Sequence, residues 1–300
     1  VYAFDAVDGV LDHSYASGSP DAGFYIGQCY PCDAIVNNVI SENNGLGYSG
    51  TNSGGSLYII SSVFKNNKGG LAPNTLDSEL LPPERETFII GNLIENNNNK
   101  DAPATQATNL SLGNGVVIAG GNNNIIKNNV IANHNLYGVI ITATADVNYW
   151  AAHGNRVESN LIINSKRADI ASSGLSNLGN CFENNYFNTS IPPGLQTLNN
   201  CDSSFYPLSA DLSGMWSSLA RVIQTSDGNY NQGDWRTFEA PANQPNMPIM
   251  DELISLGYDK TSLPVTKIWS SVKPAVEVFS QYEDVLNEIE LPVEARNYLN

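Results

Sequence analysis

Short runs of alternating apolar and polar residues, bounded by Asn or Gly, recur over the first 200 residues of the chain. The stretch 115–131 is representative, because it holds three such runs at 116–118, 125–126 and 130–131. Alternation with a period of two is typical of strands that bury one face. No helical period of 3.6 residues accompanies these runs. The pattern therefore predicts many short strands and an all-β fold.

A repeated tetrapeptide gives these runs a common spacing. It joins two polar or Gly residues to two apolar residues, and the first apolar residue serves as the anchor of each repeat. The anchors are Val10, Val39, Val63, Leu93, Val130, Leu161 and Tyr186. Successive anchors lie 24 to 37 residues apart. Repeats of this length are typical of solenoids.

Three short strands per repeat fit one coil of a parallel solenoid, in which each strand bonds to its equivalent one coil away, at about 4.8 Å. We expect six or seven coils over residues 1–201. We also expect one inward-facing row made of Val39, Val63, Leu93, Val130, Leu161 and Tyr186.

Asparagine replaces charge as the main polar residue of the repeats. The chain has 40 Asn residues, of which 33 precede Cys201. Asn tolerates left-handed backbone at the corners between strands. Equivalent Asn side chains on successive coils can also exchange amide hydrogen bonds, as in cross-β ladders. The composition therefore predicts asparagine ladders.

These repeats resemble the right-handed parallel β-helix superfamily, the fold of pectate lyases and of NosD-like exported repeat proteins. Residues 14–29, Ser-Tyr-Ala-Ser-Gly-Ser-Pro-Asp-Ala-Gly-Phe-Tyr-Ile-Gly-Gln-Cys, are similar to a segment of bacterial exported β-helix repeat proteins of unsettled activity. The resemblance covers about residues 1–200. It implies a single-stranded right-handed parallel β-helix, and it implies a c-type cytochrome as one conceivable partner. Because β-helices host many functions, it does not select an activity.

The composition changes after Cys201, which places a boundary there. Asn becomes rare in residues 202–300, and helical patterns are expected at 212–223, 250–256 and 275–289. We expect this tail of short helices and irregular segments to pack along the solenoid or to cap it. The first residues, Val1 to Phe4, already resemble a strand in mid-coil. Upstream residues or a partner are therefore expected at the N-terminal coil end.

Charge and hydropathy exclude two classes of function. The chain has 30 acidic and 14 basic residues, a net charge of −16, which would repel a nucleic-acid backbone. No stretch approaches the ~20 apolar residues that span a bilayer. No nucleic-acid partner and no membrane span are therefore expected.

Four cysteines indicate an oxidising compartment. Cys29 and Cys32 form a Cys-x-x-Cys motif, and Cys181 and Cys201 lie about one coil apart. Two disulfides, Cys29–Cys32 and Cys181–Cys201, are expected, although free thiols and metal or redox chemistry remain alternatives. Disulfides would place the protein outside the cell, in the periplasm or at the cell surface.

Loops of uneven length should gather on one side of the solenoid. The segments 27–33, 50–56, 73–86, 142–154 and 172–179 all leave the same corner of the coil, whereas the insertion 98–113 leaves the neighbouring corner. Recognition in solenoids usually lies on such loops. The candidate binding residues, with aromatic faces beside hydrogen-bonding groups, are Tyr30, Arg85, Tyr149, Trp150, His153 and Arg156.

Candidates for catalysis are few. His13 and Glu42 are expected to share a row one coil apart, where they could form an acid/base pair. Lys65 and Glu95 are expected to share a row as an ion pair. No cofactor is expected, although Asp5, Asp8, Asp12 and Asp21 could bind Ca²⁺ as an alternative.

Two functions therefore stay open. The first is an exported, non-catalytic β-helix that binds a glycan or another exported protein, or serves as an assembly scaffold. The second is a lyase, C5-epimerase or hydrolase that acts on acidic polysaccharide.

Overall fold

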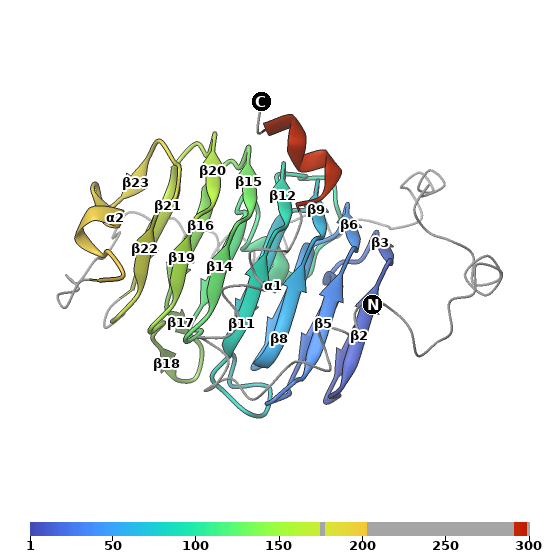
Figure 1. Cartoon of the computed structure of the whole chain (residues 1–300). Coiled ribbons are helices and arrows are strands. Elements are labelled where there is room, and N and C mark those ends of the chain that lie inside the picture. The colour runs from blue at the N-terminus through green and yellow to red at the C-terminus, as the bar shows by residue number, and fades with distance from the viewer. Residues whose placement is uncertain (175–177, 203–290, 299–300) are drawn as a thin grey trace.

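The computed structural model describes residues 1–174, 178–202 and 291–298, and these form a solenoid of three parallel sheets (Figure 1). Sheet A consists of β1 (Tyr2–Phe4), β4 (Ala22–Gly27), β7 (Leu46–Thr51), β10 (Gly69–Asn74), β13 (Val116–Ala119), β16 (Tyr137–Thr142), β21 (Ala168–Ser173) and β23 (Ser190–Ile191). Sheet B consists of β2 (Gly9–Asp12), β5 (Ala34–Asn37), β8 (Gly54–Ile60), β11 (Arg85–Ile90), β14 (Ile125–Lys127), β19 (Arg156–Glu158) and β22 (Cys181–Glu183).

Sheet C consists of β3 (Tyr15–Ser17), β6 (Ile40–Glu42), β9 (Val63–Lys65), β12 (Leu93–Glu95), β15 (Val130–Ala132) and β20 (Leu161–Ile163). The other elements are the antiparallel pair β17 (Thr144–Ala145) and β18 (Tyr149–Trp150), the helices α1 (Gln106–Asn109) and α2 (Leu195–Leu198), and the 3₁₀ helix η2 (Val293–Tyr298). No helix of the described residues is long and apolar enough to cross a membrane.

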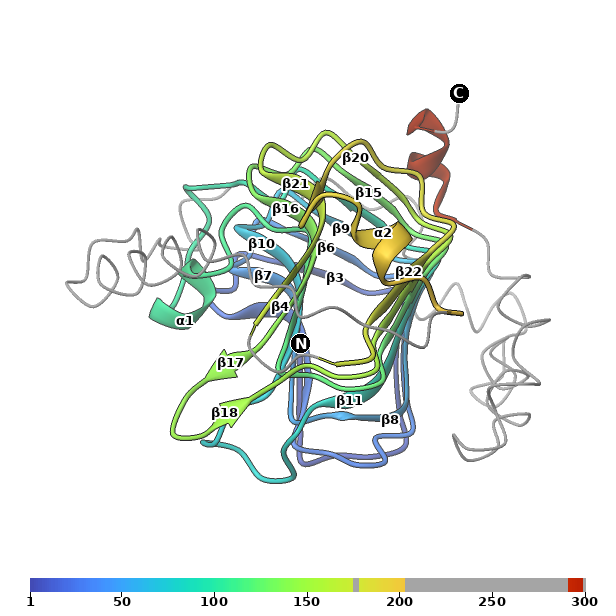
Figure 2. The same ribbon diagram turned by 90° about the vertical axis from the view of Figure 1, so that its left-hand side faces the viewer.

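The solenoid is a right-handed parallel β-helix. Figure 2 looks along the stack with the last coils nearest the viewer. The chain passes from sheet A to sheet B to sheet C anticlockwise as it advances toward the viewer, which defines a right-handed coil. Sheet B has seven strands, one for each coil of the described residues. The predicted fold class is confirmed.

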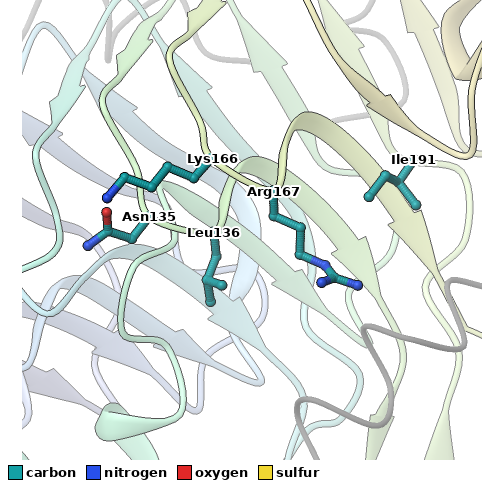
Figure 3. A pocket seen from close by; sticks show the side chains of 5 residues that line it. All are labelled: Asn135, Leu136, Lys166, Arg167 and Ile191. Atoms are coloured by element: carbon teal, nitrogen blue, oxygen red, sulfur yellow. The ribbon is translucent and has the colours of Figure 1, made fainter.

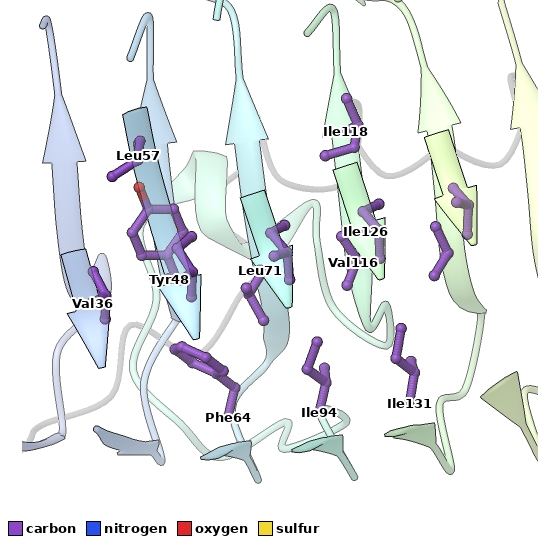
Figure 4. Close-up of a cluster of buried hydrophobic side chains, with 14 of the residues drawn as sticks. Val36, Tyr48, Leu57, Phe64, Leu71, Ile94, Val116, Ile118, Ile126 and Ile131 are labelled. Atoms are coloured by element: carbon purple, nitrogen blue, oxygen red, sulfur yellow. The ribbon is translucent and has the colours of Figure 1, made fainter. Parts of the chain in front are cut away.

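The core fills the space between the three sheets. Phe64, Ile94 and Ile131 of sheet C point inward toward Leu71 and Val116 of sheet A (Figure 4). Each of these side chains is at most 1 % exposed. Because neighbouring residues of a strand point to opposite faces, the residues before them in sheet C must point outward.

Of the predicted inward row, Val39 does lie in the main core, but the members in sheet C are wrong by one face. Val63, Leu93 and Val130 stack in register, but they face outward and form a separate cluster with Ala295. Tyr186, at the end of this row, is 68 % exposed. The apolar spacing was right, but neighbouring apolar residues in each tetrapeptide gave no signal for which one faces the core.

The first two anchors are also displaced along the chain. Ile40, not Val39, pairs with Val63, and Tyr15, not Val10, pairs with Ile40. Val10 belongs to sheet B, where it pairs with Ile35.

Asparagine ladders run through the interior, as predicted. In one ladder each Nδ2 donates to the Oδ1 of the next coil at 2.9–3.0 Å, through Asn92, Asn129, Asn160 and Asn185. A second ladder contains Asn44, Asn67 and Asn97 and reaches His134. Burial lowers the pKa of His134 to about 3, so this imidazole is neutral.

Asparagines also occupy the corners. Asn43, Asn66, Asn96, Asn133 and Asn164 follow the strands of sheet C, and all have φ between 54° and 62°. This left-handed conformation is one that Asn adopts more readily than most residues.

The C-terminal residues 291–298 lie on the outer face of sheet C. Ala295 is fully buried against the row of Val63, Leu93 and Val130, and the Tyr298 hydroxyl bonds to Glu95. The helices predicted at 212–223, 250–256 and 275–289 lie outside the described residues.

Candidate functional site: the loop flank

The loops that connect sheet A to sheet B share one corner of the β-helix, which we call the loop flank. The described residues of the five predicted segments lie there, which for the last segment means 172–174 and 178–179, together with the short connection 120–124. The longest connections are 75–84 and 143–155, and the latter carries the β17–β18 hairpin (Figure 2). The insertion 98–113 leaves from the corner between sheets C and A, as expected.

Tyr30 and Arg85 form the first group of the loop flank. The guanidinium carbon of Arg85 lies 3.5 Å from the centre of the Tyr30 ring, a cation–π contact. The Tyr30 hydroxyl donates to Glu86 at 3.0 Å, and the ring is 40 % exposed. Arg85 is held further by hydrogen bonds to the carbonyls of Leu81 and Pro83. Two loops that lie two coils apart are thereby joined.

Trp150 forms the second group with Asp77. The indole Nε1 donates to Oδ1 of Asp77 at 3.2 Å, and Asn148 donates to both carboxylate oxygens at 2.7 Å. The backbone and side-chain hydrogen bonds from Asn148 hold the pKa of Asp77 below its usual range. Tyr149, next to Trp150, is 50 % exposed. The long loop 75–84 therefore touches the hairpin on one side.

His153 and Arg156 take other partners. His153 Nδ1 accepts the backbone N–H of Leu178 at 3.2 Å. Arg156, in β19, bonds to Glu158 of the same strand at 3.1 Å. The structure thus brings Tyr30 to Arg85 and Trp150 to the same long loop, whereas His153 and Arg156 are used in local contacts. The binding role of all six residues stays a prediction.

A cluster that sequence reasoning missed lies on sheet A beneath the same loop. The Tyr25 hydroxyl bonds to both carboxylate oxygens of Glu79 at 2.6 and 2.7 Å. The ring of Tyr2 stacks on that of Tyr25, with centroids 4.0 Å apart. Burial raises the pKa of Glu79, and the negative charge of Asp21 adds to the effect. Burial also raises the pKa of Asp21. Glu79 stands 54 residues from Tyr25, and no spacing indicated that its loop folds back over the sheet.

The predicted pair of His13 and Glu42 is wrong. Glu42 pairs in register with Ser17 and Lys65, whereas His13 sits at the corner before β3 and bonds to Asp12. The error follows from the displaced anchors. Glu42 instead accepts a hydrogen bond from Tyr15 at 2.6 Å.

Lys65 and Glu95 do share a row. The ion pair at Lys65, however, is with Glu42, at 3.8 Å.

Both expected disulfides are present. Cys29–Cys32 lies within the loop flank beside Tyr30, and Cys181–Cys201 joins β22 to the residues after α2. In the part of the chain that the structure describes, no three His, Cys, Asp or Glu side chains group as a metal site would require. The aspartates Asp5, Asp8, Asp12 and Asp21 accordingly do not assemble into such a group.

Comparisons with known proteins add little to this geometry. No family model matches the chain, and no curated protein matches it. Among solved structures, the chain is similar to the A-module of the mannuronan C-5 epimerase AlgE4 from Azotobacter vinelandii, with 14 % identity and a TM-score of 0.36. The match covers 60 % of this chain and 56 % of that one, so it spans about half the length of the epimerase module. The fold assignment therefore rests on the three sheets described above.

Proposed function

We propose that the protein is an exported β-helix scaffold that binds an uncharged glycan at the loop flank without a reaction there. The observation that carries this proposal is the fixed position of Trp150 and Tyr30, each of which contacts side chains of residues 75–86. Rigid aromatic rings beside hydrogen-bonding groups suit the apolar faces and hydroxyls of a sugar. The two disulfides are compatible with export.

Charge favours a neutral sugar over an anionic partner. The described part of the loop flank carries Asp33, Asp77, Glu79, Glu84, Glu86 and Asp146 against the guanidinium groups of Arg85 and Arg156. An anionic ligand would meet repulsion there. This narrows the glycan that the sequence led us to expect to an uncharged one.

The test is a glycan screen with wild-type protein and the variants Trp150→Ala and Tyr149→Ala, followed by calorimetry. Removing an aromatic platform should lower affinity for a neutral oligosaccharide by about tenfold or more. Tyr186→Ala is the matched control, since this exposed ring lies on sheet C away from the loops. If Trp150→Ala strongly lowers the melting temperature while no glycan distinguishes the proteins, the flank is a packing surface.

The wild-type protein and the same two variants also test whether the loop flank binds a protein partner. An exported protein, such as a c-type cytochrome, would be retained by immobilised wild-type protein and released by the same variants. Capture that persists in both variants would place a protein interface elsewhere, for example at the first coil. Val1, Tyr2 and Val7 are each more than half exposed there. The expected partner at that coil end stays a prediction.

A polysaccharide-cleaving enzyme is the second candidate, and the Tyr25–Glu79–Asp21 cluster is the observation that favours it. A carboxyl with a raised pKa beside a second carboxyl is the arrangement of acid/base chemistry on glycosidic bonds. New reducing ends or unsaturated products, abolished by Glu79→Gln, would establish catalysis. Their absence with binding intact would leave the scaffold proposal standing.

A further inference from the structure

A shallow pocket opens at the corner between sheets C and A in the last coils, on the edge of sheet A away from the loop flank. Its volume is about 560 Å³, and Asn135, Leu136, Lys166, Arg167 and Ile191 line it (Figure 3). Residues 135–136 precede β16, residues 166–167 precede β21, and Ile191 belongs to β23. None of these residues was singled out by the repeat pattern or by the loop lengths.

Two cations line this pocket in a chain whose net charge is −16. Lys166 is exposed and lies within ion-pair distance of no carboxylate among the described residues. Lys65 and Lys127, by contrast, are each paired with a Glu on a neighbouring coil. The ammonium group of Lys166 is therefore available to a ligand.

Arg167 is held in place by the residue beneath it. Its Nε donates to the Tyr137 hydroxyl, and its guanidinium carbon lies 5.6 Å from the centre of the Tyr137 ring. A planar guanidinium in a fixed orientation binds a carboxylate in a defined geometry, at lower entropic cost than a mobile cation.

The two cationic groups lie at opposite ends of the pocket. In Figure 3 the Lys166 side chain extends toward Asn135, whereas the Arg167 side chain extends away from it, on the side of Ile191, with Leu136 between them. A ligand with one anionic group at each end and an uncharged span between them matches this order. The amide of Asn135 can bond to a hydroxyl, and Leu136 and Ile191 can contact C–H faces.

We propose that this pocket binds an acidic oligosaccharide, with carboxylates of separate sugar rings at Lys166 and Arg167. This proposal rests on the proposed function only in taking the ligand to be a glycan. The position of the pocket, its charge and the acidic sugar that it would bind all differ from those of the loop flank. Sugar rings supply the hydroxyls and apolar faces between the charges that the lining of the pocket requires. The volume lies in the range of small-molecule sites.

Calorimetry with trigalacturonate tests the proposal, and its fully methyl-esterified form is the matched neutral probe. Wild-type protein should bind the acid at least about tenfold more tightly than the ester, and added salt should weaken the binding. Lys166→Gln and Arg167→Gln should each lower the affinity, and the double variant should lower it by about tenfold or more. Arg167→Lys should retain part of the affinity, since it keeps the charge but loses the planar fork.

The control is the pair Lys65→Gln and Lys127→Gln, which removes the same charge from sheets C and B, where neither residue lines the pocket. Equal loss in this control, or equal binding of the ester, would overturn the proposal. Tighter binding of an acidic Asp/Glu peptide that competes with the sugar would also overturn it. Arg167 packs on Tyr137, so a loss of affinity in Arg167→Gln is interpreted only if the melting temperature is unchanged. If it falls, Lys166→Gln carries the test, because the Lys166 side chain is exposed. Trp150→Ala should leave trigalacturonate binding unchanged, so failure here is separate from failure at the loop flank.

Discussion

Glu84 places a carboxyl group in the interior of the protein. It is fully buried, and its carboxyl accepts hydrogen bonds at 2.8 Å from Thr87 Oγ1 and Asn124 Nδ2. Burial raises its pKa to about 8. A Cβ at Gly121 would lie 1.9 Å from Glu84 Oε2, so only glycine leaves room for the carboxyl there. At neutral pH the folded protein therefore holds Glu84 mostly as the neutral acid.

We predict that Glu84 makes stability fall as pH rises. Its pKa is raised in the folded state, so the folded protein binds the extra proton between pH 4.5 and about 8. The contribution is complete below pH 4.5 and is lost as pH rises through 8, at a cost on the order of 4 kcal/mol. Glu84→Gln, which mimics the neutral acid, should flatten the profile in urea unfolding from pH 5 to 9.

Glu86→Gln is the control for Glu84→Gln, since it alters the neighbouring carboxylate that bonds to Tyr30 and leaves Glu84 in place. It should retain the wild-type pH dependence. A wild-type free energy of unfolding that is constant from pH 5 to 9 would contradict the role of Glu84.

At the scale of elements, the sequence predicted the number and order of strands better than it predicted which side chains of each strand point into the core. Anchors from Val63 to Leu161 fall in one register row because hydrophobic spacing repeats once per coil. The pattern did not show which residue points into the core where two consecutive residues of a strand are both apolar, as in Leu93-Ile94. The outer face of sheet C is itself apolar because residues 291–298 cover it. That partner lies about 200 residues away, beyond the reach of any local pattern.

We predict that a charge introduced on the inner face of sheet C lowers stability more than a charge introduced on its outer face. Ile94 is in the main core, so Ile94→Asp should prevent folding, at a cost above about 4 kcal/mol. Leu93 lies under residues 291–298, and an Asp there can reach water once that segment detaches. Leu93→Asp should therefore cost less, about 2 kcal/mol, with faster proteolysis at the C-terminus. Urea unfolding followed by circular dichroism measures both.

A chain ending at residue 290 separates the two effects of Leu93→Asp. Without the covering segment, the substitution should change the free energy of unfolding by less than about 1 kcal/mol, because the two changes share one interaction. Equal losses from Leu93→Asp and Ile94→Asp would show that both faces belong to one core.

Sequence reasoning located the loop flank but not its contacts. The loops were found because their lengths vary at one corner, which a repeat pattern reveals. Asp77, which holds Trp150, and Glu79, which holds Tyr25, were missed because loop residues follow no period. The pocket at Lys166 and Arg167 was missed for another reason. It is assembled from one or two residues of each of three coils, none unusual in its own repeat.

At the scale of the whole molecule, the last coil is closed by its own chain. Leu195 of α2 is fully buried in the main core. The side-chain oxygen of Gln196 accepts hydrogen bonds from the backbone N–H and from Nδ2 of Asn185, each at 2.9 Å. The ladder that begins inside the solenoid thus ends on this short helix. Cys181–Cys201 ties the same segment to β22, three residues past α2.

Because each coil of a solenoid contacts only its neighbours, we predict that losing this disulfide loosens the last coils and spares the first. Closure of a loop of about 20 residues contributes roughly 3 kcal/mol by chain entropy. In Cys181→Ser/Cys201→Ser, hydrogen exchange should therefore accelerate in β21 and β22 and stay unchanged in β4 and β7. Cys29→Ser/Cys32→Ser is the matched control, since its partners are three residues apart and should affect only residues 28–33. Faster exchange in all coils alike would mean that the β-helix unfolds as one unit, and that its end is no weaker than its centre.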